Sequence, residues 1–462
     1  MTNFLSRRQM LRSSAVGFGW LALADLLAAK PQAAIDPLAP KPSHFPAKAK
    51  RVIFLFMHGG PSQVDTFDYK PKLDADHGKP LPFPKPRVVS GATGNLLRSP
   101  FKFKQYGQSG AWVSELFPHI GNCVDDLCFI KSMHGSNSRH GGALLELHTG
   151  SDTFVRPNMA SWITYGLGTE NRDLPGFITI CPTLTHGASN NYSSAFLPAI
   201  YQGTALGSAG TSSDRVTVPF IKGTTPPEQQ RLELDLLGAM DRERLAHLGP
   251  DPMMEGRIQS FEMAFRMQMA APELQDISKE TDATKKLYGL DDPATANYGR
   301  QCLLARRFAE SGVRFVQCTH SYKWDQHGNL KADHTKNARE VDKPIAGLLI
   351  DLKKRGLLDD TLVLWGGEFG RTPVAQGNDG RDHNPHGFTY FLAGGGIKPG
   401  ISFGATDDYG YYSVTDKVHI HDLHATMLHL LGLDHEKLTY RFAGRDFRLT
   451  DVHGNVVKQI LA

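Results

Sequence analysis

The stretch RVIFLFM at Arg51–Met57 decides the fold. It is a continuous run of apolar, strand-forming residues that stops at Gly59, Gly60 and Pro61. Strands of a parallel sheet are buried on both faces, so their sequences are unbroken apolar runs rather than alternating ones. The glycines and the proline mark a turn at the carboxyl end. These residues therefore predict a central strand of a parallel sheet.

Similar runs recur along the chain, with helical stretches between several of them. They lie at Cys128–Lys131, Phe177–Ile180, Val313–Cys318, Thr361–Trp365 and Phe388–Ala393. One helix is clear at Asp333–Arg355, where apolar residues recur at spacings of three and four before Gly356. Strands that alternate with helices predict an α/β fold: a doubly wound, mostly parallel central sheet with helices on both faces.

Two stretches without strand signals complete the domain organisation. Residues from about 225 to 290 are rich in charge, Leu and Met, which predicts a helical insertion. Residues Pro182–Gly223 are rich in Gly, Ser, Thr and Asn, which predicts a long surface loop bordering a site. We therefore expect one large domain over residues 51–462, preceded by an extended leader at residues 35–50.

Composition is that of a globular protein without a strong charge bias. The chain has 462 residues, 40% of them hydrophobic, and a formal net charge of +4. Four basic residues and one acidic residue lie within residues 1–34, so the remainder is close to neutral. This balance argues against a nucleic-acid partner.

The first 34 residues are typical of a targeting segment. SRRQMLR at Ser6–Arg12 places paired arginines ahead of the weakly apolar stretch Ala15–Ala29, and small residues follow at Ala33 and Ala34. The segment resembles a twin-arginine export signal, which predicts a periplasmic or secreted protein. The alternative is an amphipathic first helix that happens to begin with arginines. The apolar stretch is too short for a stable membrane span.

Cysteine usage excludes two other sources of stability. The five cysteines are few and odd in number for an exported protein, so a disulfide framework is not expected. No CxxC pair is present, which argues against a zinc site built from thiolates.

The motif WDQH offers the first candidate metal ligands. Asp325 and His327 follow the predicted strand Val313–Cys318 and precede the long helix. Ligand sites in such sheets lie beyond the carboxyl ends of the strands. A carboxylate and an imidazole there suit zinc, manganese or iron. The alternative is a loop turn with solvated polar groups.

Two further motifs follow in the carboxyl-terminal third. In GGEFGRTP, Glu368 lies just beyond a predicted strand, and the guanidinium of Arg371 matches the oxygens of phosphate or sulfate. GRDHNPHG contributes Arg381, His383 and His386 from a predicted loop that must bend back to reach the others. The alternatives are a surface pair of Glu and Arg, and a hydrogen-bonded turn.

Candidate catalytic residues also follow the earlier strands. MHGGPSQVDTFDYKP places His58 and Asp65 after the first strand, where Asp65 is either a ligand or a helix cap. SMHGSNSRHGG offers Ser136 or Ser138 as a nucleophile activated by a metal or by a neighbouring histidine, and His140 as a substrate-binding residue. Neither a phosphate-binding P-loop nor a GxSxG elbow is present.

These motifs, together with GRDHNPHGFTYFLAGGGIKPG and HDLHATMLHLLGLDHEKLTYRFAGRDFRLTD, resemble the alkaline phosphatase and sulfatase superfamily. The resemblance covers nearly all of residues 51–462 and is to a twin-arginine-exported, sulfatase-like branch described as a domain of unknown function. It implies an alkaline-phosphatase-like fold. It also implies metal-ligand positions at Asp325, His327 and the helical Asp342, and Glu368 in place of an acid whose neighbouring histidine is here Phe369.

The resemblance also implies substitutions in the ligand set. His383 or His386 must supply the missing nitrogen if two ions bind. His58 stands where the first strand is expected to end in an acid, so Asp65 takes over that role. The sulfatase signature, Cys or Ser followed two residues later by Pro and then Arg, is absent, so a formylglycine nucleophile has no candidate. Ser136 is the nearest match to the expected nucleophile.

We therefore predict an exported, metal-dependent hydrolase of phosphate or sulfate esters. It would hold one or two divalent ions, with Zn, Mn, Ca and Mg not distinguished, and act on a small-molecule or polysaccharide anionic ester. Arg371 or Arg381 would clamp the anion. One alternative is a non-catalytic binding protein on the same fold that recognises a sulfated polymer or a surface partner. Another is a phosphomutase-like transferase. The number of subunits stays open.

Overall fold

A computed structural model describes residues 36–84, 86, 91–216, 225–249 and 251–462. The predicted export signal at residues 1–34 lies outside the described residues. From residue 36 to 50 the chain runs without helix or strand. It is attached to the domain by backbone hydrogen bonds such as Lys41 N–H to Leu167 O (2.9 Å) and Lys48 N–H to Leu430 O (2.8 Å).

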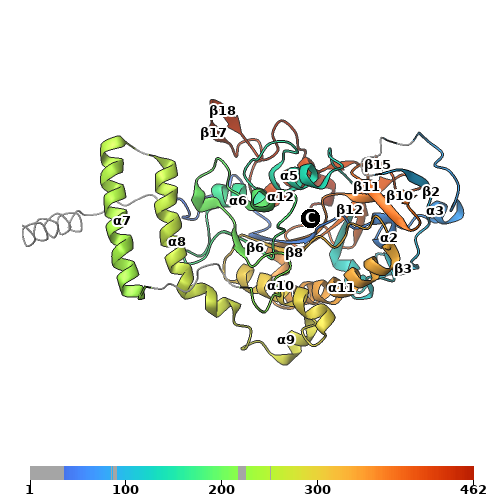
Figure 1. The fold of residues 1–462 in the computed structure, drawn as a ribbon, viewed down its shortest axis with the longest axis horizontal. Coiled ribbons are helices and arrows are strands. Elements are labelled where there is room, and N and C mark those ends of the chain that lie inside the picture. Colours follow the sequence, from blue (N-terminus) through green and yellow to red (C-terminus); the bar gives the residue numbers. More distant parts are fainter. Residues whose placement is uncertain (1–35, 85, 87–90, 217–224, 250) are drawn as a thin grey trace, which may run out of the picture.

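A nine-stranded sheet forms the centre of the molecule (Figure 1). The central strand β1 pairs in parallel with β8 on one side and β9 on the other, and β8 pairs in parallel with β6. Strand β12 is antiparallel to both of its neighbours. The order is β13 (Ile401–Phe403), β5 (Leu127–His134), β12 (Phe388–Ala393), β9 (Thr361–Gly366), β1 (Arg51–Met57), β8 (Phe315–His320), β6 (Phe177–Ile180) and β7 (Thr204–Leu206), with β16 (Val418–His419) beside β5.

Helices cover both faces of this sheet, as Figure 1 shows. Ile53, Leu55 and Met57 of β1 belong to a core shared with α10 (Pro293–Glu310) and α11 (Leu330–Lys354). The alternate residues Val52, Phe54 and Phe56 belong to a second core, shared with α5 (His140–Thr149), α6 (Met159–Leu167) and α12 (Ile420–Leu430). Because side chains of a strand alternate between faces, an apolar run of this kind requires a cover on each side. The predicted doubly wound, mostly parallel α/β fold is confirmed.

The smaller elements extend this core. The expected helical insertion consists of α7 (Pro227–Leu248), α8 (Pro252–Gln275) and α9 (Asp282–Leu287), with α7 and α8 side by side at one end of the molecule (Figure 1). Other short helices and strands are α2 (Gln63–Thr66), α3 (Pro71–Ala75), β3 (Phe103–Tyr106), β4 (Ala111–Ser114), α4 (Pro118–Gly121), β14 (Ala405–Thr406), β15 (Ser413–Thr415), β17 (Tyr440–Phe442) and β18 (Arg445–Phe447).

A three-stranded sheet beside the central one matters most for the site. Its order is β11 (Gly380–Asn384), β10 (Gly370–Gln376) and β2 (Thr93–Leu96). The motif GRDHNPHG, predicted as a loop, is therefore mostly strand, and Arg371 pairs with His383 across the β10–β11 hairpin. This hairpin folds His383 back over the sheet edge.

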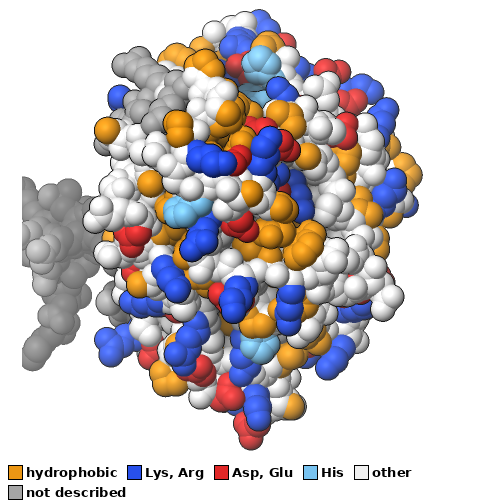
Figure 2. Space-filling view, turned by 90° about the vertical axis from the view of Figure 1, so that its right-hand side faces the viewer, with side chains coloured by type: hydrophobic (Ala, Val, Ile, Leu, Met, Phe, Trp, Pro, Cys, Tyr) orange, Lys and Arg blue, Asp and Glu red, His pale blue; other side chains and the backbone are white. Residues whose placement is uncertain are grey.

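The surface mixes charges of both signs with apolar groups. The face drawn in Figure 2 shows Lys and Arg side chains spread among Asp, Glu and hydrophobic ones. Among the described helices, none combines the length and apolar character needed to cross a bilayer.

Trp365 should contribute strongly to folding, because it is 1% exposed at the centre of the sheet. Its ring stacks on Phe391 at 5.1 Å and meets Phe67 edge-on at 5.2 Å. We expect Trp365→Ala to lower the free energy of unfolding by about 3–5 kcal/mol in urea titrations. Trp112→Ala, at a side chain that is 37% exposed, is the control. Equal losses in the two variants would contradict this assignment of the core.

Candidate metal centre

The site lies where the central parallel strands end, on one edge of the sheet. His58 directly follows β1, Glu368 lies two residues after β9, and Asp325 lies in the loop that follows β8. His140 is the first residue of α5, and His383 comes from β11. Neighbouring parallel strands deliver their following loops to the same edge, which is why residues from five segments converge.

Three imidazoles converge on one oxygen of Asp325. Its Oδ1 lies 2.9 Å from Nε2 of His327, 3.1 Å from Nε2 of His383 and 3.3 Å from Nε2 of His140. Nη2 of Arg371 approaches the same oxygen to 2.6 Å. Burial alone would raise the pKa of Asp325, but these histidines and the guanidinium charge together lower it far below its ordinary value. The carboxylate is therefore ionised at any physiological pH.

Glu368 contributes a second buried carboxylate to the cluster. It is fully buried, accepts the N–H of Gly59 at 3.1 Å on each oxygen, and lies 2.6 Å from Nδ1 of His140. Burial opposes ionisation, but mainly the hydrogen bond with His140 lowers the pKa of Glu368 to about 2. Burial likewise works against a charged His140, and Asp325 and Glu368 outweigh it and raise the pKa of His140 to about 9. His140 thus stands between the two acids.

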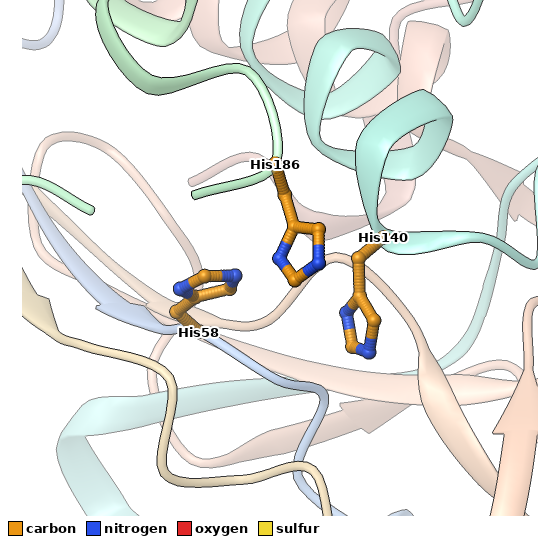
Figure 3. Close-up of side chains that lie close together, drawn as sticks. All are labelled: His58, His140 and His186. Carbon is orange, nitrogen blue, oxygen red and sulfur yellow. The ribbon is translucent and has the colours of Figure 1, made fainter. Parts of the chain in front are cut away.

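His58 and His186 complete the cluster, as Figure 3 shows. His58 is 0% exposed, and neither of its ring nitrogens has a hydrogen-bond partner among the described residues. A buried, unsatisfied polar group costs about 1–3 kcal/mol, so such a group calls for a ligand. The His186 ring lies 5.6 Å from that of His58 and 4.9 Å from that of His140.

These side chains fit a metal by number, type and spacing. Ligand atoms lie within 4.8 Å of one another in three overlapping groups: His58, His140 and His186; His140, Asp325 and His383; and His327, Asp382 and His383. Imidazole and carboxylate ligands suit zinc, manganese or iron. Each of these groups contains at least two histidines, which distinguishes the site from a surface cluster of acids.

Outer contacts fix the orientation of the ligands. The Nδ1 of His383 lies 2.8 Å from the carbonyl oxygen of Ser138, and a carbonyl only accepts, so Nδ1 carries a hydrogen. The hydroxyl of Tyr322 donates to Oδ2 of Asp325 at 2.9 Å. The indole of Trp324 donates to Nδ1 of His320 at 2.9 Å, which anchors the loop beside Asp325. Partners of this kind set the tautomer and direction of metal-binding groups.

The guanidinium of Arg371 is engaged by acceptors within the protein. Its side chain is 0% exposed and donates to the carbonyl oxygens of Gly59, Gly60 (3.0 Å) and Arg381 (3.3 Å), as well as to Asp325. All of these partners belong to the protein. The structure therefore differs from the predicted anion clamp, and Arg371 instead orients the Asp325 carboxylate.

Asp65 and Arg381 are also used internally. Nε and Nη2 of Arg381 donate to the two oxygens of Asp65 at 2.7 and 3.2 Å, and both side chains are 0% exposed. Burial pushes the pKa of Asp65 up, while the charge and hydrogen bonds of Arg381 outweigh it and leave the pKa below its ordinary value. The prediction of Asp65 as a metal ligand and Arg381 as a substrate contact therefore differs from the structure.

Two other implied ligands lie outside the cluster. His386 is exposed, and its ring lies 5.3 Å from that of Tyr412. Asp342 accepts the N–H groups of His119 (2.9 Å) and Ile120 (2.8 Å) at the start of α4. It follows the first residue of α11 by twelve positions, roughly 18 Å along the helix, so it is too far from the sheet edge to join Asp325.

Ser136 borders the cluster without joining it. It lines a hollow of about 80 Å³ together with His383, Asp382 and His386. Its Oγ lies 3.1 Å from Nε2 of His419, whose Nδ1 accepts the N–H of His421. Because Nδ1 of this histidine is the acceptor, Nε2 carries the hydrogen and cannot take a proton from the serine. The nucleophilic role of Ser136 stays a prediction.

Comparison with known proteins gives one family match and several distant structures. A family model described as "Protein of unknown function (DUF1501)" matches residues 49–461. No curated protein matches the chain. The lipoteichoic acid synthase LtaP from Listeria monocytogenes has a TM-score of 0.38 and 10% identity, with 93% of this chain and 80% of that chain covered.

Two further structures show similar values. Alkaline phosphatase from the Antarctic bacterium TAB5 has a TM-score of 0.35 and 10% identity, covering 83% of this chain and 98% of that one. The PsFucS1 sulfatase from Pseudoalteromonas sp. has a TM-score of 0.35 and 12% identity, covering 84% and 68%.

Proposed function

The chain belongs to the DUF1501 family, and we propose that its site makes it a metal-dependent hydrolase of phosphate or sulfate esters. The proposal is supported by residues that converge from strand ends far apart in the sequence. We call the group formed by Asp325, His327 and His383, with His140 beside it, the first position. The proposed substrate class is an anionic ester. Arg371 and Arg381 are bonded to carboxylates of the protein, so a bound cation would supply the positive charge that attracts the ester.

One observation carries the proposal: the contact between His383 and Asp325. Nδ1 of His383 donates to the Ser138 carbonyl, so in the neutral ring Nε2 presents a lone pair. That lone pair faces Oδ1 of an ionised carboxylate at 3.1 Å. Burial lowers the pKa of His383, which favours the neutral ring. Nε2 of His327 lies 3.0 Å from the same nitrogen and 2.9 Å from the same oxygen, so three potential ligand atoms meet at one point, and a cation bound by all three would take the place of these close polar contacts.

A divalent ion at this position would polarise the ester and stabilise negative charge on its oxygens. The protein groups around it have separate tasks. Arg371 holds the Asp325 carboxylate ionised and in one direction, and Glu368 holds the His140 ring. The hollow lined by His383 and Ser136 provides space for the substrate group beside them.

The start of α5 adds a feature suited to an anion. The amide N–H groups in the first turn of a helix have no intrahelical acceptor and attract negative charge. Here that turn begins with His140 and continues with Gly141, where an added Cβ would meet no atom within 4 Å. Arg139, the preceding residue, is exposed. An ester oxygen can therefore approach this turn closely.

Removal of metal should abolish activity. The wild-type protein, purified from cells supplied with zinc and manganese, is expected to hydrolyse 4-nitrophenyl phosphate or 4-nitrophenyl sulfate. Treatment with a chelator should stop this hydrolysis, and added zinc or manganese should restore it. Elemental analysis before and after treatment tests the link between metal content and turnover.

His327→Ala removes an imidazole from the first position. His247→Ala, which removes an imidazole at an exposed position on α7, is the control. We expect only the first substitution to lower metal content and hydrolysis. A wild-type chain that binds metal without hydrolysing either ester would support the alternative of a binding protein. A chain that stays metal-free in supplied cells would contradict the proposed function.

A further inference from the structure

We infer that two copies of this chain pair through one side of α7. The contact surface consists of Leu232, Leu236, Leu237 and Met240, and we call it the α7 face. The second copy would lie antiparallel to the first, about a two-fold axis. The inference is independent of the metal centre, because α7 lies at one end of the molecule and α8 lies between it and the central sheet (Figure 1).

Exposed apolar side chains are concentrated on these two helices. α7 and α8 contain 22 and 24 residues, yet they hold eight of the sixteen large apolar side chains that are exposed in the described part of the chain. On α7, Leu232 is 66% exposed and Met240 is 54% exposed. Because contiguous apolar patches on a protein surface mark interaction sites, this concentration indicates that the hairpin binds a partner.

The α7 face lies opposite the side that packs on α8. Leu232, Leu236 and Met240 recur every four residues, which places them along one side of the helix. The inner side is held by Arg231, which donates to the two oxygens of Glu262 on α8 at 2.6 and 2.8 Å. The buried residues of α7 are one glycine and one alanine. Most of the stability of a helix in a protein comes from packing, so a partner on the α7 face would stabilise α7.

Charges beside the apolar residues select a second copy of the chain as that partner. Glu233 and Arg244 are exposed and form no ion pair with any described residue, whereas other ion pairs of α7 join it to α8. The pairs Leu237–Met240 and Glu233–Arg244 have the same midpoint along the helix. An antiparallel copy centred on that midpoint therefore brings each Glu233 opposite Arg244 of the other copy. It also brings each Leu237 opposite Met240, which gives the self-complementary contact that two-fold symmetry requires.

The charge of α7 argues against a lipid surface as the partner. The helix carries five acidic residues and three arginines. Helices that lie on membranes are rich in Lys and Arg on their polar side, because anionic lipids attract them. A helix with net negative charge is repelled by such a surface, whereas a second copy places an arginine opposite each Glu233.

The mass of the protein in solution tests the pairing. Sedimentation equilibrium of the full-length wild type should give twice the chain mass of 50.9 kDa. Leu237→Glu and Met240→Glu each place a carboxylate in the apolar contact of both copies, so each should raise the dissociation constant of the dimer about a hundredfold. Val452→Glu, at a side chain that is 72% exposed outside the hairpin, is the control and should leave the dimer unchanged. Far-ultraviolet circular dichroism checks that each variant is folded.

A charge swap tests the antiparallel register. Glu233→Arg alone, or Arg244→Glu alone, places like charges opposite each other at both ends of the contact. Each single variant should therefore weaken the dimer about tenfold. The double variant, which combines Glu233→Arg with Arg244→Glu, exchanges the two charges and should restore the dissociation constant of the wild type.

Three results would overturn the inference. A monomeric wild type, or a dimer that persists unchanged in folded Leu237→Glu, would exclude pairing through the α7 face. A monomeric wild type that cosediments with vesicles of phosphatidylethanolamine and phosphatidylglycerol would make a lipid surface the partner instead. A double variant that dimerises as weakly as the single charge variants would exclude the antiparallel register.

Discussion

Asp325→Ala is expected to abolish metal uptake at the first position and hydrolysis with it. The substitution removes the one oxygen on which His140, His327 and His383 converge. It also leaves Arg371 buried without a carboxylate, which alone should destabilise the fold by about 3–5 kcal/mol. Metal content by elemental analysis and hydrolysis of the two nitrophenyl esters are the measurements.

Two further variants separate loss of the ligand from loss of the fold. Asp325→Asn keeps the shape of the side chain and removes its charge, so it should fold better than Asp325→Ala while still losing metal. Asp359→Ala, at an exposed carboxylate elsewhere on the surface, should change neither metal content nor turnover. Full metal content in a folded Asp325→Asn protein would contradict the role of this residue.

Asp65→Ala is expected to have the opposite profile, with a large loss of stability and no loss of metal. It leaves the fully buried Arg381 guanidinium without its carboxylate partner, and breaking a buried pair in this way costs about 3–5 kcal/mol. Urea titrations at pH 7 measure the loss of unfolding free energy, and zinc titration of the folded variant measures the number of zinc ions bound per chain. If the variant binds fewer zinc ions than the wild type, Asp65 is a metal ligand and this assignment is wrong.

The same pair predicts a dependence on pH. The pKa of Asp65 in the folded protein is below its ordinary value, so its contribution to stability is fully present above the unfolded pKa, about 3.9. That contribution is lost as pH falls through the folded pKa. The difference in urea midpoint between wild type and Asp65→Asn should therefore be constant from pH 7 to about pH 5 and shrink in stronger acid. An unchanged difference at low pH would contradict the pairing.

The central sheet could be predicted because its strands carry their own signal. RVIFLFM at Arg51–Met57 is apolar at every position but the first, and the structure packs alternate residues against two separate cores. The same reasoning placed Asp325, His327 and Glu368 at strand ends, and the structure brings all three to one edge. Position after a strand was thus a sufficient signal for where these three side chains lie, and their role as metal ligands stays a prediction.

The β10–β11 hairpin could not be predicted in the same way. GRDHNPHG contains turn-forming Gly, Asn and Pro, and its strand character depends on pairing with β10. His186 was missed because it lies in a loop rich in small polar residues, with only its type as a signal. The pairing of Asp65 with Arg381 joins residues separated by 316 positions, and nothing in either local sequence specifies it.

Roles within the cluster depend on side-chain geometry that local sequence does not contain. Arg371 was predicted to face an anion, but its donors are taken by backbone carbonyls and by Asp325. His140 was predicted to contact substrate, and its two nitrogens instead lie beside two acids. The types of these residues and their approximate places in the fold could be predicted from the sequence. The hydrogen-bond and ion-pair partners of each side chain could be identified only in the folded structure.

The most direct test of the account is a crystal of the full-length protein soaked in zinc chloride and measured at the zinc absorption edge. We predict an anomalous peak bound by Asp325, His327 and His383, at the edge of the sheet where β1, β8 and β9 end. A crystal with zinc only at other surfaces, and with the Asp325 and His383 side chains in direct contact, would contradict it.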